Sequence, residues 1–150
     1  MTKLLTLIGL MILLGSCSTN KKLSQNLPPE NEEPILIDSN TFYISEISKN
    51  KSYGLTPKNP VEVGESSSSS WQQNERRYLN ALAGPNGERL AYYHAGSCCP
   101  IKSDKAIFGN SVMLDRYRVT WEGSSDTVSI YINMFDSGEL KAPLGFNIKK

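Results

Sequence analysis

A period-2 alternation of apolar and polar positions dominates the C-terminal half of the chain and predicts β-strands there. One strand is expected from 112 to 121, where one face carries four apolar side chains: Met113, Tyr117, Val119 and Trp121. Another is expected from 127 to 135, where Val128, Ile130 and Ile132 alternate with other residues. Shorter extended runs are expected at 35–37, 42–44, 61–63 and 89–95, and the segment 140–148 is expected to pair back onto the sheet.

A helical period replaces this alternation after a run of five serines. Trp71, Tyr78, Leu79 and Leu82 recur at spacings that place them on one helical face. Ser70-Trp71-Gln72-Gln73 has the form of a capping box, and Gly84-Pro85 is a typical stop. The pattern predicts a helix over about residues 71–83. The economical architecture is an α+β fold, with an antiparallel sheet of short strands packed on this one main helix.

The apolar run from Leu4 to Leu14 suits the core of a signal peptide and is too short to span a bilayer. It ends in Gly15-Ser16-Cys17, which resembles the lipobox of bacterial lipoproteins. The resemblance implies that the chain is cut before Cys17, that Cys17 receives a diacylglyceryl group, and that the new amino terminus is acylated, for example by palmitate. The alternative is an ordinary secretory signal that happens to precede a cysteine.

This cleavage defines three regions: a signal peptide over 1–16, a lipidated tether over 17–34, and a single α+β domain over 35–150. The tether is polar and rich in proline and glutamate, so it cannot bury enough apolar surface to order itself. The processed chain of 134 residues has 15 Lys and Arg against 15 Asp and Glu. A neutral chain has no broad electrostatic reason to bind nucleic acid, so that class of function is excluded.

The lipid implies a membrane location. Three acyl chains hold a protein firmly to a bilayer, so the domain needs no further membrane contact. Ser18 follows Cys17 where an aspartate would suggest retention in the inner membrane. By resemblance, the expected location is the outer membrane, on the leaflet that faces the periplasm.

Two cysteines remain for chemistry, adjacent at Cys98 and Cys99 between Gly96 and Pro100. Exported thiols normally find a partner, and here the only one within the chain is the neighbouring residue. Gly96 and Pro100 suit a tight turn that would accept the ring closed by such a bond. Three interpretations stay open: a vicinal disulfide, two buried free thiols, and a catalytic or metal-binding role.

The single histidine, His94, lies four residues before Cys98 and is a candidate catalytic base. In a regular strand His94, Gly96 and Cys98 would share one face, with the two end residues some 13 Å apart. The alternative is a half-exposed strand histidine without a role. Arg76 and Arg77 are candidate contacts for an anion, or else part of a solvated helix face. No pattern for a cofactor or a metal is present, since one histidine and two cysteines do not make a tetrahedral zinc site.

From Asn74 to Phe146 the chain resembles a group of small uncharacterised lipoproteins of Bacteroidetes. The resemblance is carried by three segments above all, 74–88, 96–99 and 131–136, which read NERRYLNALAGPNGE, GSCC and YINMFD. The resemblance implies a location in the cell envelope more than it implies an activity. Some members carry the product name 2-dehydro-3-deoxyphosphooctonate aldolase. Such an aldolase is a cytoplasmic barrel of roughly 250 residues, so the name is unsupported for this shorter, exported chain.

The function expected from the sequence is therefore a non-enzymatic, lipid-anchored domain that binds an envelope protein or another envelope component, or serves as a structural module. The alternative is an envelope thiol or redox protein, or an enzyme, that uses Cys98 or Cys99. No cofactor is expected for either.

The lipid anchor is tested by the intact mass of the full chain extracted from membranes. We expect residues 1–16 to be absent and Cys17 to carry the mass of a diacylglyceryl group, with a further acyl chain on its amino group. The Cys17→Ser variant is expected to keep residues 1–16 and gain no lipid. An unmodified Cys17 in the mature protein would contradict the lipobox interpretation.

Overall fold

The computed structural model describes residues 34–64 and 70–150, so Cys17, the signal segment and the tether up to residue 33 lie outside the described part. Eight strands and one helix follow each other in the order β1, β2, β3, α1, β4, β5, β6, β7, β8 within it. Their bounds are β1 Leu36–Asp38, β2 Thr41–Phe42, β3 Val61–Glu62, α1 Trp71–Asn80, β4 Leu82–Ala83, β5 Leu90–Lys102, β6 Ser111–Trp121, β7 Val128–Asn133 and β8 Asn147–Ile148. This part of the chain is a mixed α+β fold with one short helix.

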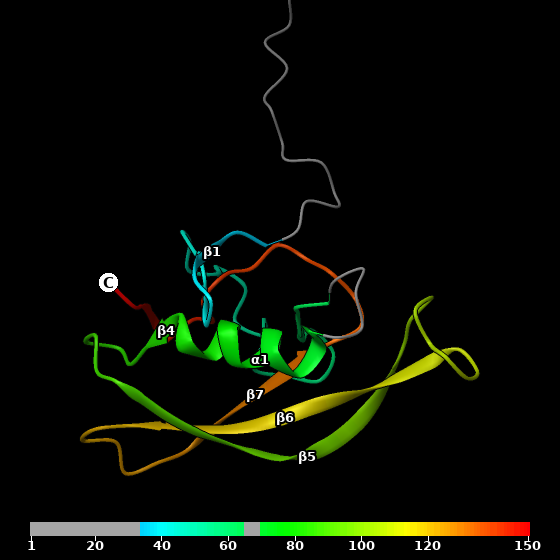
Figure 1. Cartoon of the computed structure of the whole chain (residues 1–150). Helices are drawn as coiled ribbons and strands as arrows, with labels where there is room; N and C mark the ends of the chain where they lie inside the picture. Colours follow the sequence, from blue (N-terminus) through cyan, green and yellow to red (C-terminus); the bar gives the residue numbers. More distant parts are fainter. Residues whose placement is uncertain (1–33, 65–69) are drawn as a thin grey trace, which may run out of the picture.

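The main sheet has four strands in the order β3-β7-β6-β5, and two smaller sheets pair β1 with β2 and β4 with β8. β5, β6 and β7 are antiparallel neighbours, whereas β3 runs parallel to β7. Figure 1 shows β5 and β6 as a long curved hairpin that extends to one side beyond α1. The expected antiparallel pairing is confirmed for β5, β6 and β7, whereas β3 and β7 pair in parallel and β5 is longer than expected.

β5 differs most from its prediction. The expected strand over 89–95 continues to Lys102, and the turn expected between Gly96 and Pro100 is absent. Instead the pairing with β6 shifts register twice, between His94 and Ser97 and again between Cys98 and Ile101. Each shift contains a residue with positive φ, Gly96 at 107° and Cys99 at 57°. A bulge absorbs an extra residue and bends the strand, so the chain passes this point without reversing direction.

The helix begins at Trp71 as predicted but ends at Asn80, because Leu82 and Ala83 leave the helix to pair with β8. Ser70 makes no side-chain capping hydrogen bond, so the expected capping box does not form. Trp71 at the start of the helix packs edge-on against Phe135, with 4.9 Å between the ring centroids. The aromatic contact with Phe135, two residues after β7, thus positions the first turn of the helix.

The core is one buried cluster to which α1, the main sheet and the segments around them contribute. Tyr78 and Leu79 of the helix join Ile130 and Ile132 of β7 in one buried cluster. The remaining buried members are Phe42, Ile44, Val61, Val63, Ala81, Leu82, Tyr117, Val119, Ala142 and Phe146. The alternation predicted over 127–135 is confirmed by the burial of Ile130 and Ile132.

Met113 and the residues of β1 lie outside this core, although their apolar pattern predicted strands there. Met113 is 46% exposed, although the alternation placed it on the face of Tyr117 and Val119. Its neighbour Leu114 is fully buried instead, so the buried positions of β6 change from even to odd numbers after Leu114. β1 forms where apolar residues predicted it, yet its three residues are all exposed. Within residues 34–64 and 70–150, no helix is long and apolar enough to cross a membrane.

Candidate functional site

Three of the sequence-predicted site residues, His94, Cys98 and Cys99, lie on β5, an edge strand of the main sheet. Cys98 and Cys99 are joined by a disulfide bond and are partly buried in the middle of this strand. Of the three interpretations that the sequence left open, the structure therefore contains the vicinal disulfide. Cys99 adopts the left-handed backbone conformation, with φ of 57°, which is uncommon for a residue other than glycine.

The first register shift of β5 brings two polar side chains to one carboxylate. The imidazole Nε2 of His94 donates to Oδ1 of Asp115 at 3.0 Å, and the hydroxyl of Ser97 donates to the same oxygen at 2.5 Å. The extra residues of the bulge bring Ser97, rather than Cys98, to the position beside His94. Within the described part of the chain, no hydrogen bond links His94 to either cysteine, so the expected pairing of base and thiol is not seen.

Asp115 is one of two buried acids beneath α1. The second is Glu75, whose side chain is fully buried on the inner face of the helix. The hydroxyl of Tyr117 donates to Oε2 of Glu75 at 2.8 Å. We call Glu75, Asp115 and Tyr117, together with His94 and Ser97, the carboxyl cluster.

Burial raises the pKa of Glu75 to about 8, because an apolar environment disfavours the charged form. The hydrogen bond from Tyr117 acts in the opposite direction, while the charge of Asp115 raises the pKa further. Arg76 lowers it slightly. The pKa of Tyr117 is also raised, first by burial and then by the charge of Glu75. The cluster therefore holds Glu75 in its neutral form at pH 7, so that Glu75 and Asp115 do not both carry charge.

The two candidate arginines of α1 have different surroundings. Arg77 makes hydrogen bonds within the domain. Its Nε donates to the carbonyl of Ser39 at 3.0 Å, and its Nη1 donates to Oδ1 of Asn74 at 2.8 Å. Its guanidinium also lies 6.0 Å from the centroid of the Phe42 ring. Arg77 thus ties the β1–β2 turn to the helix. Arg76 is exposed, and its role as an anion contact stays a prediction.

This arrangement limits the chemistry that the cluster can perform. Glu75 and Asp115 are almost completely shielded from solvent, so a substrate cannot reach them in this conformation. His94 has an exposed side chain, but Ser97 donates to Asp115 and not to His94, which is not the geometry of an activated nucleophile. Among residues 34–64 and 70–150, no group of three or more His, Cys, Asp and Glu side chains could hold a metal ion.

Glu75, Ser97, Asp115 and Tyr117 are not predicted as partners from the sequence, although the pattern of apolar positions contains a signal for two of them. Glu75 follows Trp71 by four residues and precedes Leu79 by four, which places it on the apolar face of the helix. Asp115 lies two residues before Tyr117, on the buried face of β6. An acid on each of two apolar faces that meet in the core indicates a paired or protonated carboxyl group.

Comparison with protein-family models, with curated proteins and with solved structures finds no match to this chain. The assignment of function therefore depends on the chain's own residues.

The neutral Glu75 predicts a pH-dependent stability. The folded protein holds a proton that the unfolded chain releases above about pH 4.5, so stability falls as the pH rises from about 5 to 8. The slope approaches about 1.4 kcal/mol per pH unit in this range. Glu75→Gln keeps the shape without the titration, so its stability is expected to change less between pH 5.5 and 7.5. Urea unfolding of the full chain at both pH values measures the difference.

The matched control is Glu139→Gln, because the Glu139 side chain is 73% exposed. Its stability is expected to follow that of the wild type with pH. His94 is present in all three proteins and does not affect the comparison. Equal pH dependence in the wild type and in Glu75→Gln would contradict the assignment of a neutral Glu75.

Proposed function

We propose that this chain is a non-enzymatic, lipid-anchored module of a bacterial cell envelope, on the periplasmic side of the outer membrane, and that it binds an envelope protein through its β5–β6 hairpin. The Cys17 lipobox supports the anchor. The observation that carries the binding role is the apolar tip of the hairpin. Phe108 is 89% exposed and Ile107 is 68% exposed, although both are large apolar side chains.

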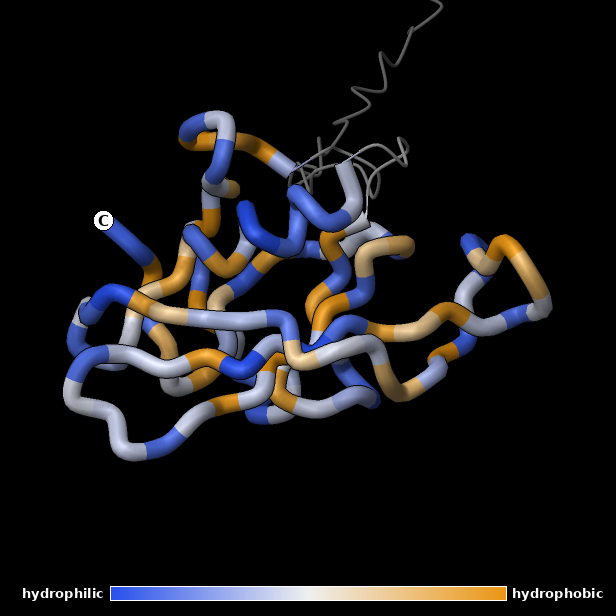
Figure 2. Tube along the Cα trace, turned by 60° about the horizontal axis from the view of Figure 1, so that its bottom comes forward, coloured by the Kyte–Doolittle hydropathy of each residue, from blue (hydrophilic) through white to orange (hydrophobic). Residues whose placement is uncertain are grey.

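The tip is held out from the core by ordered contacts. Ser103, at its base, donates to Oδ1 of Asp136 at 2.8 Å and accepts from the backbone N–H of Lys105 at 3.0 Å. Figure 2 shows the apolar stretch at the end of the projecting hairpin, separate from the apolar residues of the core. An apolar contact that the fold holds away from its own core supports a protein-binding role, because burial by a partner would remove this surface from water.

The outer edge of β5 favours contact through side chains over strand addition. β5 pairs only with β6 in the main sheet, so its other edge carries backbone groups without a strand partner in the described residues. The two register shifts interrupt this edge, which hinders pairing with a second chain over its full length. We take α1 to be the element on which the sheet packs, since Tyr78 and Leu79 share a cluster with Ile130 and Ile132. This support leaves the hairpin free to project.

A photo-crosslinker tests the hairpin directly. We expect a benzoyl-phenylalanine placed at Phe108 of the full, membrane-bound chain to give a discrete protein adduct on illumination of intact cells. The matched control replaces Tyr43 with benzoyl-phenylalanine. Tyr43 is 53% exposed on a different part of the domain, and the crosslinker there is expected to give no such adduct. Absence of an adduct at 108, or the same adducts at both positions, would contradict the hairpin as the binding surface.

A second candidate function is thiol–disulfide exchange, favoured by the bond between Cys98 and Cys99 on the outer strand. A dithiol donor would attack one sulfur, form a mixed disulfide, and leave two thiols here and a disulfide in the donor. The step transfers two electrons to this chain. It requires that the bond be reducible in the folded protein.

Alkylation followed by intact-mass measurement tests this candidate. In the folded full chain, Cys98 and Cys99 are expected to take two labels after reduction and none before it. Lipidated Cys17 takes no label in either case and serves as an internal control. Labelling without reduction would contradict the disulfide, whereas labelling only after denaturation would contradict a role in exchange.

A further inference from the structure

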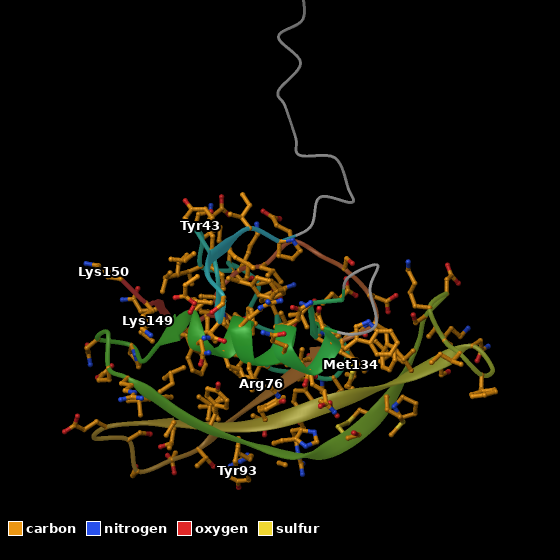
Figure 3. The ribbon with its side chains drawn as sticks, viewed as in Figure 1. Tyr43, Arg76, Tyr93, Met134, Lys149 and Lys150 are labelled. Carbon is orange, nitrogen blue, oxygen red and sulfur yellow. A yellow bond between two sulfur atoms is a disulfide. The ribbon has the colours of Figure 1, made fainter. Side chains whose placement is uncertain are left out.

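A groove of about 770 Å³ lies at the end of the molecule opposite the hairpin tip, between the end of α1, β4, the loop 84–90 and the C-terminal strand β8. Its lining combines apolar, cationic and other polar residues. Leu90 and Ile148 are partly exposed and contribute apolar surface, whereas Leu79 and Leu82 are buried. Three cations, Arg89, Lys149 and Lys150, line the same groove, and Figure 3 shows Lys149 and Lys150 at this end of the helix.

Backbone pairing fixes the position of these cations. Leu82 and Ile148 pair across β4 and β8, and the N–H of Lys149 donates to the carbonyl of Ala81 at 2.9 Å. The loop before Arg89 is closed by the N–H of Gly84, which donates to the carbonyl of Glu88 at 2.8 Å. Basic residues from positions 89 and 149–150 are thereby brought to one groove by tertiary contacts.

The cations of this groove have no ion-pair partner among the residues that the structure describes. Of the ion pairs seen within residues 34–64 and 70–150, none involves Arg89, Lys149 or Lys150. Glu88 is the one acidic side chain that lines the groove, and both of its oxygens accept hydrogen bonds from Asn86, at 2.8 and 2.9 Å. The groove therefore has an excess of positive charge, with cationic groups free to contact a ligand.

The polar groups near the apolar lining are already satisfied. The hydroxyl of Tyr92 donates to Oδ1 of Asn80 at 2.8 Å, and Nδ2 of Asn80 donates to the carbonyl of Asn40 at 2.9 Å. Leu79 and Leu82 are buried beneath these groups, and Leu90 and Ile148 are partly exposed. A ligand in the groove thus meets both cationic side chains and the apolar surface of Leu90 and Ile148.

We propose that this groove binds a small anion with an apolar body, such as a phosphate monoester or a carboxylate joined to a short hydrocarbon. The cations pair with the anionic head by charge-assisted hydrogen bonds. The partly exposed side chains of Leu90 and Ile148 contact the hydrocarbon, and a bare phosphate ion would not use this apolar surface. The proposal is independent of the hairpin and of the disulfide, so a failed crosslink at Phe108 does not affect it.

Titration calorimetry of the full chain in nanodiscs of neutral lipid tests the proposal, with butyl phosphate as the probe. Butyl phosphate is expected to bind about 10-fold more tightly than inorganic phosphate, since partial burial of a few methylene groups stabilises the complex by that factor. The double variant Lys149→Gln and Lys150→Gln is expected to weaken butyl phosphate binding about 10-fold or more, because charge-assisted hydrogen bonds are lost. Ile148→Thr is expected to reduce the preference for butyl phosphate over inorganic phosphate.

The matched control is the double variant Lys51→Gln and Lys58→Gln, which removes two exposed lysines far along the chain from the groove residues. Its affinity is expected to equal that of the wild type. Phosphatidate added to the nanodisc distinguishes two sources of the ligand: competition with butyl phosphate indicates a lipid headgroup, and unchanged binding indicates a soluble molecule. Equal loss of affinity in both lysine variants, or no saturable binding of butyl phosphate, would overturn the proposal.

Discussion

The register shift in β5 between His94 and Ser97 is the constraint on which the rest of the site depends. In a regular strand, His94 and Cys98 would share a face and Ser97 would point away from both. The bulge at Gly96 moves Ser97 onto Asp115 beside His94, so that one buried carboxylate holds the strand on both sides of the bulge. Glycine suits this position because φ is 107°, which an L side chain rarely adopts. The disulfide follows directly after this anchored segment.

Burial of two acids under one helix is costly unless one of them is neutral, because two adjacent carboxylates cannot both stay charged in an apolar environment. The fold meets this requirement by protonating Glu75 and by surrounding it with Tyr117 and Asp115. The result is a polar connection from the helix through β6 to the exposed imidazole of β5. Such a connection links α1 to β6 and β5 through polar groups, in addition to the apolar contacts of the core.

The two proposed binding regions lie at opposite ends of the long β5–β6 hairpin. At one end, the turn between the strands carries Ile107 and Phe108 into solvent. At the other, the start of β5 borders the groove that Arg89 shares with the C-terminal lysines. Figure 1 shows this separation, with the C-terminus at the end of the domain away from the hairpin tip. The sheet between them, braced by the carboxyl cluster, holds the two regions apart, so their ligands need not compete.

The sequence by itself determined the features that depend on neighbouring residues. Periodicity placed the helix start at Trp71 and the buried face of β7 at Ile130 and Ile132, because amphipathic spacing is a local property. The adjacent cysteines likewise limited the disulfide to one pairing. Only the tertiary structure decided the length of β5, the early end of α1 and the carboxyl cluster. These depend on pairing between distant segments: Glu75 and Tyr117 are 42 residues apart, and strand register is not encoded by the alternation within one strand.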